Sequence, residues 1–125
     1  MTIKISALDR LFSRYIRFVR DSRTCQRCGK VYPAKTQGLD CAHVFSRAKK
    51  SVRFYPDNAV SLCSFPCHRD LDLHTTEKHA WWRERIGEDR WAKLLLKMSV
   101  PAKVDGLMVK RWLEQEVVNR TEGCS

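Results

Sequence analysis

The sequences CQRCG (residues 25–29) and CSFPC (residues 63–67) place two close pairs of cysteines in the middle of the chain. Zn²⁺ favours four tetrahedral ligands, and two thiolate pairs from separate segments form a closed structural site. The second pair has a three-residue gap, which is longer than usual but within the range of zinc ligands. The spacing predicts a structural zinc ion held by all four cysteines, with buried apolar thiols as the alternative. The predicted ligands are Cys25, Cys28, Cys63 and Cys67.

Around this frame the chain has 125 residues, enough for a single domain with a modest core. Its apolar fraction of 43% and charged fraction of 30% are ordinary for a globular protein and argue against wholesale disorder. No apolar run approaches the roughly 20 residues of a membrane span. Arginines also interrupt the N-terminal apolar residues, where a secretory signal would be continuous. We therefore expect a soluble intracellular protein, in which six cysteines favour metal ligation over disulfides.

The net charge of +10 is concentrated in the first part of the chain. Residues 1–53 contain 13 Lys and Arg against three Asp, whereas residues 54–125 contain 11 charged residues of each sign. A polyanion, most commonly nucleic acid, is the natural partner of such a basic segment. Arg14 and Arg17 lie on the basic side of a helix that the spacing predicts over 6–23. This side either follows a phosphate backbone or is simply solvated.

The pattern is irregular between the cysteine pairs and helical after them. Alternating side chains predict two strands, at 38–45 and 60–62. Helical periodicity with stops at Gly87 and Pro101 predicts three more helices, at 68–87, 88–98 and 104–119. The last helix would suit a homodimer.

These elements predict a single α+β domain over 1–125. It consists of a basic N-terminal helix (1–23), a zinc-bound core (24–78) and C-terminal helices (79–125). Of the two remaining cysteines, Cys41 is expected in the core of a strand and Cys124 as a free thiol.

Three stretches resemble the HNH nucleases, namely LDCAHVFSR (39–47), RFYPDNAVSLC (53–63) and CHRDLD (67–72). Together with YIRFVRDSRTCQRCGK (15–30) and HAWWRERIG (79–87), they are similar to the Rap/NinG-type recombination endonucleases of lambdoid phages. The resemblance covers roughly residues 8–90. It implies a zinc-stapled ββα-metal core that hydrolyses DNA with a divalent ion. It further implies a phage or prophage protein of the bacterial cytoplasm that acts on branched or recombination-intermediate DNA.

The resemblance also implies a role for each polar residue of these stretches. His43 is the general base, because a neutral histidine can take a proton from the attacking water. Asn58 fixes a loop through backbone hydrogen bonds and orients His43. Asp40 and His68 hold the catalytic Mg²⁺ or Mn²⁺. Asp72 follows His68 by four residues and is either a further ligand or a surface carboxylate.

Four basic residues follow His43 in the loop that lies against the cleaved strand in this family: Arg47, Lys49, Lys50 and Arg53. Arg47 is the candidate for clamping the scissile phosphate, and the other three would contact the DNA backbone. No recognition helix stands out, so we expect recognition of DNA shape rather than of base sequence.

Two other functions are compatible with the sequence. A zinc-ribbon module would bind DNA without cleaving it and would not need Asp40, His43 and His68 together. An interaction protein would instead use the neutral C-terminal half around Trp112.

Overall fold

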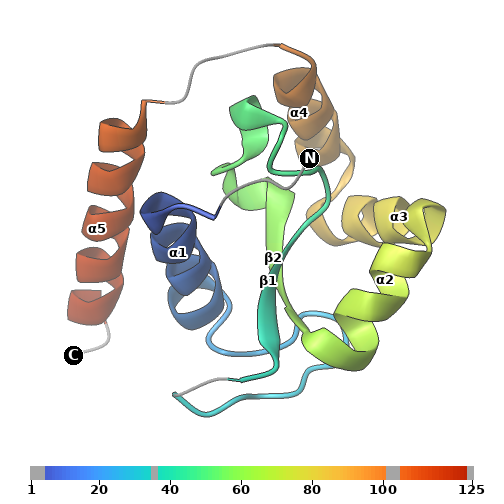
Figure 1. Ribbon diagram of the computed structural model, residues 1–125, viewed down its shortest axis with the longest axis horizontal. Helices are drawn as coiled ribbons and strands as arrows, with labels where there is room; N and C mark the ends of the chain where they lie inside the picture. The colour runs from blue at the N-terminus through green and yellow to red at the C-terminus, as the bar shows by residue number, and fades with distance from the viewer. Residues whose placement is uncertain (1–4, 35–36, 101–104, 124–125) are drawn as a thin grey trace.

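The computed structural model of the protein describes residues 5–34, 37–100 and 105–123. These residues form an α+β fold with five α-helices and a two-stranded antiparallel sheet, in agreement with the predicted fold class. The sheet pairs β1 (Leu39–His43) with β2 (Ala59–Cys63). Figure 1 shows α1 (Ala7–Arg14) beside the sheet, and α5 (Gly106–Gly123) on the side of α1 that faces away from the sheet. The opposite side carries α2 (Arg69–Leu73), α3 (Thr75–Ile86) and α4 (Glu88–Ser99).

The two faces of the sheet belong to two separate cores. Ala42 of β1 pairs with Val60 of β2, and both join the larger core, which also contains Trp82 and Leu94 of the C-terminal helices. Ala59 of β2 instead joins a smaller core with side chains of the N-terminal helix. Because side chains alternate along a strand, each strand serves both cores.

The N-terminal helix is shorter than the predicted 6–23. Ser6 caps α1 and receives a hydrogen bond from the backbone of Asp9, whose carboxylate bonds back to the backbone of Ser6. After Arg14 the chain continues in wider π-helical turns as η1 (Tyr15–Arg20). The helix ends there because Asp21 turns towards β2, where its carboxylate accepts a hydrogen bond from the backbone of Ser61.

The predicted helix over 68–87 is divided in two. A short irregular turn, η4 (Ser64–His68), leads from β2 into α2. His74 then adopts a non-helical backbone conformation with φ −132° and ψ 79°, and α3 starts after it. The predicted stop at Gly87 is confirmed, because its φ of +87° is a conformation that favours glycine. A single non-helical residue between two helical segments does not visibly interrupt the periodicity of the sequence, so the pattern predicted one continuous helix.

The last predicted helix began at residue 104, which lies outside the described residues, as does Cys124. Within α5, Leu113 is fully buried in the smaller core, and Trp112 contacts the ring of Tyr15 edge-on at 5.4 Å. Leu107 and Met108 are exposed at the start of this helix. None of the described helices is both long enough and apolar enough to cross a membrane.

Candidate metal centre and catalytic pocket

The four cysteines of the two pairs converge on one point. Cys25 and Cys28 lie on a turn before β1, whereas Cys63 ends β2 and Cys67 lies in η4. Their Sγ atoms all lie within 4.8 Å of one another, and those of Cys28 and Cys63 are 3.9 Å apart. Tetrahedral zinc with Zn–S bonds of about 2.3 Å requires sulfur atoms about 3.8 Å apart. The predicted cysteine cluster is therefore close enough to bind a metal such as zinc.

A tight backbone turn positions the first cysteine pair. The backbone N–H of Gly29 donates to the carbonyl of Cys25 at 2.9 Å, and the N–H of Cys25 donates to the carbonyl of Lys30 at 2.9 Å. Gly29 has φ +81°, a left-handed conformation that a side chain would strain. The glycine after the first pair thus lets the turn close beneath the sulfur atoms.

The thiols of the cysteine cluster differ in pKa because their surroundings differ. Burial alone would raise the pKa of Cys25, but hydrogen bonds from backbone groups of Cys28 and Cys63 outweigh it and lower that pKa to about 6. Burial and the neighbouring Cys63 thiol raise the pKa of Cys67 to about 12. The Arg27 guanidinium lies beside Cys67 and brings a positive charge to a site where bound thiolates would carry negative charge. Cys41 lies outside this cluster, and burial raises its pKa to about 12.

A pocket of about 480 Å³ lies beside β1 and brings together four of the predicted site residues. Its lining residues are Cys41, His43, Val44, Ser46, Arg47, His68, Asp72 and Lys78. Lys78, from α3, was not predicted, because a single lysine in a helix carries no motif.

The ring of His43 is held as a neutral acceptor. Its Nε2 lies 3.2 Å from the carbonyl oxygen of Arg53, which can only accept, so Nε2 carries the proton in the neutral ring. Its Nδ1 is buried and has no hydrogen-bond partner in the described part of the chain. Burial, reinforced by the positive charge of Arg47, lowers the pKa of His43 to about 4. The free protein therefore presents an unprotonated Nδ1 at neutral pH.

Asn58 is fully buried and ties together the loop that follows β1. Its Nδ2 donates to the carbonyls of Phe45 and Val52 at 3.0 Å each, and its Oδ1 accepts from the backbone N–H of Phe45 at 2.9 Å. Its own carbonyl accepts from Val44 at 3.1 Å. These bonds match the loop-fixing geometry that the resemblance implied. They reach His43 indirectly, through the residue that follows it.

His68 lies between two carboxylates. Its Nδ1 is 2.8 Å from Asp40, and its Nε2 is 3.2 Å from Asp72, which also contacts Lys78 at 2.6 Å. Asp40 and His68, both predicted as ligands of the catalytic ion, thus contact each other directly, and Asp72 lies on the same side of the short helix as His68. The two carboxylates, however, face different ring nitrogens, so they do not converge on one ligand atom of His68.

The basic residues differ in how freely they can meet DNA. Lys49 and Lys50 are exposed beside the pocket, and Arg14 is exposed on α1. Arg17 donates to the Ser13 hydroxyl at 2.9 Å. Arg53 forms two hydrogen bonds to the buried carboxylate of Asp9 in α1, at 2.9 and 2.5 Å.

Asp9 had no predicted role in the site, but it contacts a second arginine of the loop after β1. Its carboxylate also lies 3.7 Å from Nε of Arg47. Burial alone would raise the pKa of Asp9, but hydrogen bonds from Arg53 and Ser6 lower it to about 2. Asp9 therefore stays charged and holds two arginines of the loop after β1 against the N-terminal helix.

No protein-family model matches this chain, and no curated protein or solved structure is significantly similar to it. The function must therefore be argued from the cysteine cluster and the pocket beside β1.

Proposed function

We propose that the protein is a metal-dependent DNA endonuclease of the HNH type, with a ββα-metal core formed by β1, β2 and α2. The cysteine cluster would hold a structural Zn²⁺, and the pocket beside β1 would bind the scissile phosphate. The proposed substrate is branched or recombination-intermediate DNA, as the resemblance implies.

One observation carries the proposal. Among the described residues, two buried side-chain atoms have no hydrogen-bond partner, and they are Nδ1 of His43 and Nε of Arg47. Both residues line the same pocket. Buried polar groups are nearly always paired, so two buried polar atoms without partners in one pocket support the proposal that it binds a polar ligand. An acceptor nitrogen beside a cationic donor suits a water molecule and a phosphate oxygen.

The chemistry follows from these two side chains. Nδ1 of His43 takes a proton from water as the water oxygen attacks phosphorus. The bond from phosphorus to the 3′ oxygen breaks, and this oxygen receives a proton from solvent. Arg47 donates hydrogen bonds to the phosphate oxygens, whose negative charge grows during the attack. Binding of the phosphate to Arg47 also offsets the positive charge that disfavours protonation of His43.

The catalytic divalent ion would be held by His68 Nε2 and the Asp72 carboxylate, which face each other beside Lys78. Asp40 would then hold the other ring nitrogen and orient His68, as carboxylates commonly do for metal-binding histidines. A carboxylate with an imidazole suits Mn²⁺ as well as Mg²⁺. When bound, the ion would neutralise charge on the scissile phosphate and the leaving oxygen.

Cleavage of a panel of branched and linear DNAs with Mg²⁺ or Mn²⁺ tests the proposal. His43→Ala should slow cleavage by about 10²–10⁴, the usual range for a positioned general base, while DNA affinity and zinc content stay unchanged. His74→Ala is the matched control, because His74 is exposed and lies outside the pocket. His68→Ala should also be slow but should recover in part at high Mn²⁺. Wild-type cleavage by the His43→Ala variant would refute the proposal.

A second function is favoured by the two carboxylates on His68. Both ring nitrogens already have an acidic neighbour, so the arrangement is also stable as a purely structural link between β1 and α2. A zinc-stabilised DNA-binding module without catalysis would use it in this way. The intact protein would then bind DNA but cleave none of the panel with either metal, and His68→Ala would destabilise the fold.

A further inference from the structure

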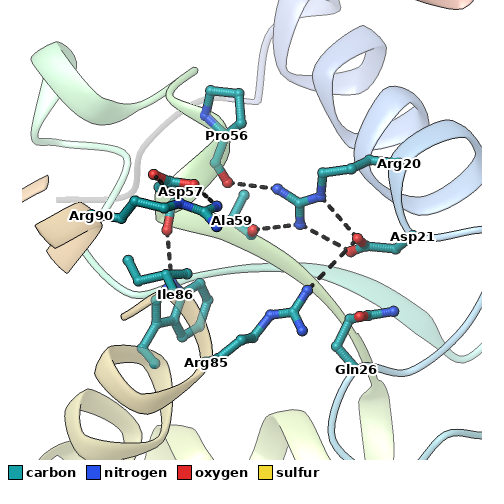
Figure 2. A pocket seen from close by; sticks show the side chains of 10 residues that line it. Arg20, Asp21, Gln26, Pro56, Asp57, Ala59, Arg85, Ile86 and Arg90 are labelled. Atoms are coloured by element: carbon teal, nitrogen blue, oxygen red, sulfur yellow. Dashed lines mark hydrogen bonds and ion pairs between the residues drawn. The ribbon is translucent and has the colours of Figure 1, made fainter. Parts of the chain in front are cut away.

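A second pocket, of about 320 Å³, lies beside the outer edge of β2. Figure 2 shows that three arginines surround it: Arg20 at the end of η1, Arg85 on α3 and Arg90 on α4. The candidate catalytic pocket takes its strand residues from β1, whereas this one takes Ala59 from β2. The two pockets therefore lie at opposite edges of the two-stranded sheet. No predicted site residue lines the arginine pocket.

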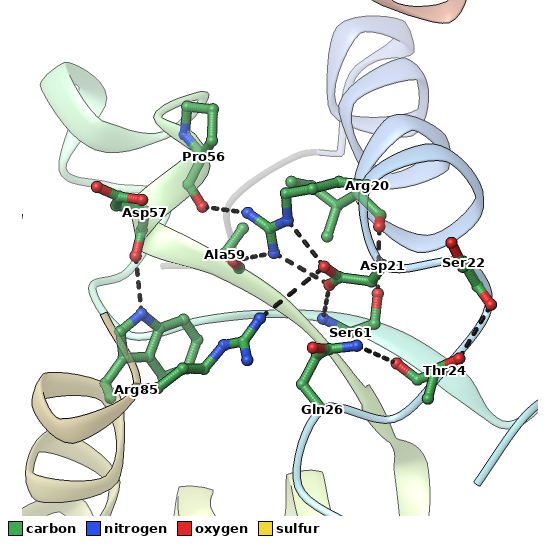
Figure 3. A network of polar contacts seen from close by, with 12 residues as sticks. Arg20, Asp21, Ser22, Thr24, Gln26, Pro56, Asp57, Ala59, Ser61 and Arg85 are labelled. Atoms are coloured by element: carbon green, nitrogen blue, oxygen red, sulfur yellow. Dashed lines mark hydrogen bonds and ion pairs between the residues drawn. The ribbon is translucent and has the colours of Figure 1, made fainter. Parts of the chain in front are cut away.

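The Arg20 side chain, on one side of the arginine pocket, stabilises the fold through hydrogen bonds. Its guanidinium bonds both oxygens of Asp21, at 2.8 and 3.0 Å, and also donates to the carbonyls of Pro56 and Ala59. Figure 3 shows these contacts continuing through Asp21 to the backbone of Ser61. They satisfy backbone groups of β2 that a third strand would otherwise pair. The donors of Arg20 are thus largely committed to the fold.

Arg90 is also paired, because its guanidinium bonds both carboxylate oxygens of Asp57. Arg85 differs from both. Its nearest carboxylate is Asp21 at 4.0 Å, which is beyond hydrogen-bond distance, and no hydrogen bond of its guanidinium is recorded among the described residues. Three guanidinium groups face two carboxylates, which leaves one positive charge in surplus. Partial burial of its side chain lowers the pKa of Arg85, as do the nearby cations Arg20 and Arg90, and the more distant Asp21 carboxylate offsets this only in part.

We infer that this arginine pocket binds one phosphate group, with Arg85 as the residue that contacts its oxygens. Guanidinium groups bind phosphate oxygens through paired hydrogen bonds, and Arg85 is the one of the three whose guanidinium makes no hydrogen bond to the described residues. Arg20 and Arg90, held by their carboxylates, add a fixed positive field around it. The phosphate belongs to the backbone of bound DNA or is a free anion. The first source deepens the proposed function, on which it rests, by giving the DNA a second contact across the sheet from the cleavage pocket.

The test compares Arg85→Gln with Arg83→Gln. Both variants remove one positive charge from α3, but Arg83 is exposed, pairs with Glu88 and lies outside the pocket. Duplex DNA affinity is measured by fluorescence anisotropy over a range of salt concentrations. Inorganic phosphate is titrated separately while the Arg85 side-chain NMR signal is followed. Arg85→Lys serves as a second variant that keeps the charge, and circular dichroism verifies that all variants fold.

Arg85→Gln should weaken DNA binding about 3–10-fold and flatten the salt dependence by about 0.9 in log–log slope, the value for one phosphate contact. Arg83→Gln should change affinity less than about twofold, as expected for a charge that contacts no phosphate. Arg85→Lys should keep most of the wild-type slope. Saturable phosphate shifts at Arg85, without a DNA effect specific to Arg85→Gln, would assign the site to a free anion and still support it.

Equal behaviour of Arg85→Gln and Arg83→Gln with DNA, together with no response of Arg85 to phosphate, would overturn the inference. Its failure is separable from that of the proposed function, because Arg85 does not line the pocket beside β1 in which cleavage is proposed. At saturating DNA, Arg85→Gln should cleave at the wild-type rate. A wild-type protein that cleaves nothing but whose Arg85 still responds to phosphate would refute the nuclease while leaving the phosphate site intact.

Discussion

The cysteine cluster and the pocket beside β1 adjoin the same two strands but are built in opposite ways. In the cluster, four ligand atoms converge within 4.8 Å, and each pair of ligands is close in sequence. In the pocket, side chains come from β1, the loop after it, α2 and α3, and two buried polar atoms lack partners. The first could hold a metal that ties two segments of the chain together, whereas the second leaves buried polar atoms that a ligand could pair. The comparison distinguishes the cysteine cluster, whose expected role is to stabilise the fold, from the pocket beside β1, whose expected role is to bind a ligand.

Loss of the metal is the largest expected effect and would sharpen this contrast. Structural zinc contributes on the order of 10 kcal/mol of apparent folding free energy, which rivals the whole stability of a small domain. A strong chelator should therefore unfold the protein as well as abolish cleavage. Elemental analysis should find one zinc ion per chain, and circular dichroism would follow the loss of structure.

Cys28→Ser isolates the metal from packing, because Cys28 is exposed and its replacement leaves no cavity. We expect zinc content and melting temperature to fall together in this variant. Cys41→Ser is the control, since Cys41 lies outside the cluster, and it should retain zinc. A metal-free protein that stays fully folded would show that the cysteine cluster does not stabilise the fold through a metal.

The fold was largely predictable because its signals are local. Cysteine spacing and the stop at Gly87 each act within a few residues, and the cysteine cluster and the stop are both found as predicted. The break at His74 and the early end of the N-terminal helix were missed. The early end of the N-terminal helix depends on a tertiary contact, the hydrogen bond from Ser61 to Asp21, that no local pattern encodes. The break at His74 is confined to a single residue between two helical segments.

The site was predictable in its residues but not in its connections. His43, Arg47, His68 and Asp72 line one pocket, although only the resemblance had grouped them. Periodicity could not show that Asp9 binds Arg53, because the two residues are 44 positions apart. The arginine pocket at β2 was missed for the same reason: its charges are ordinary surface charges until the fold gathers them.

The pH dependence of stability offers a smaller test of the pocket. Because burial lowers the folded-state pKa of His43 to about 4, the unfolded chain takes up the proton first as pH falls below its ordinary value of 6.5. The groups that act on the ring are Arg47 and Lys78, which disfavour the charge, and Asp9 and the Arg53 carbonyl, which favour it. Stability should therefore decrease between pH 6.5 and 4, by up to about 3 kcal/mol.

Denaturant unfolding at several pH values measures this term. His43→Gln should lose the dependence between pH 6.5 and 4 while differing from the wild type at pH 8 only by a constant. An unchanged pH profile in this variant would show that the ring is not held neutral, and the contrast between a satisfied cluster and an unsatisfied pocket would break down.

Asp9 should act in a separate and lower pH window. Its folded-state pKa of about 2 lies below its ordinary value of 3.8, so its contribution is full above pH 4 and is lost as pH falls towards 2. Asp9→Asn should cost about 2 kcal/mol at pH 7 and remove the acid dependence in this window. Asp89→Asn is a matched control, because Asp89 also lies in the first turn of a helix but is exposed. Its cost should stay below about 0.5 kcal/mol.

The smallest effect concerns the basic loop beside the pocket. Lys49 and Lys50 are exposed, whereas Arg53 is held by Asp9, so a variant of Arg53 would mix binding with stability. Replacing both lysines with glutamine should leave unfolding unchanged and flatten the salt dependence of DNA binding by about 1.8 in log–log slope, the value for two lost phosphate contacts. Lys93→Gln with Lys110→Gln removes the same charge from the electrically neutral part of the chain and should change the slope little. Equal slopes in the two double variants would mean that the excess charge acts as a diffuse field. DNA would then not be held against the pocket by this loop, and the cleavage geometry would have to rest on Arg47 alone.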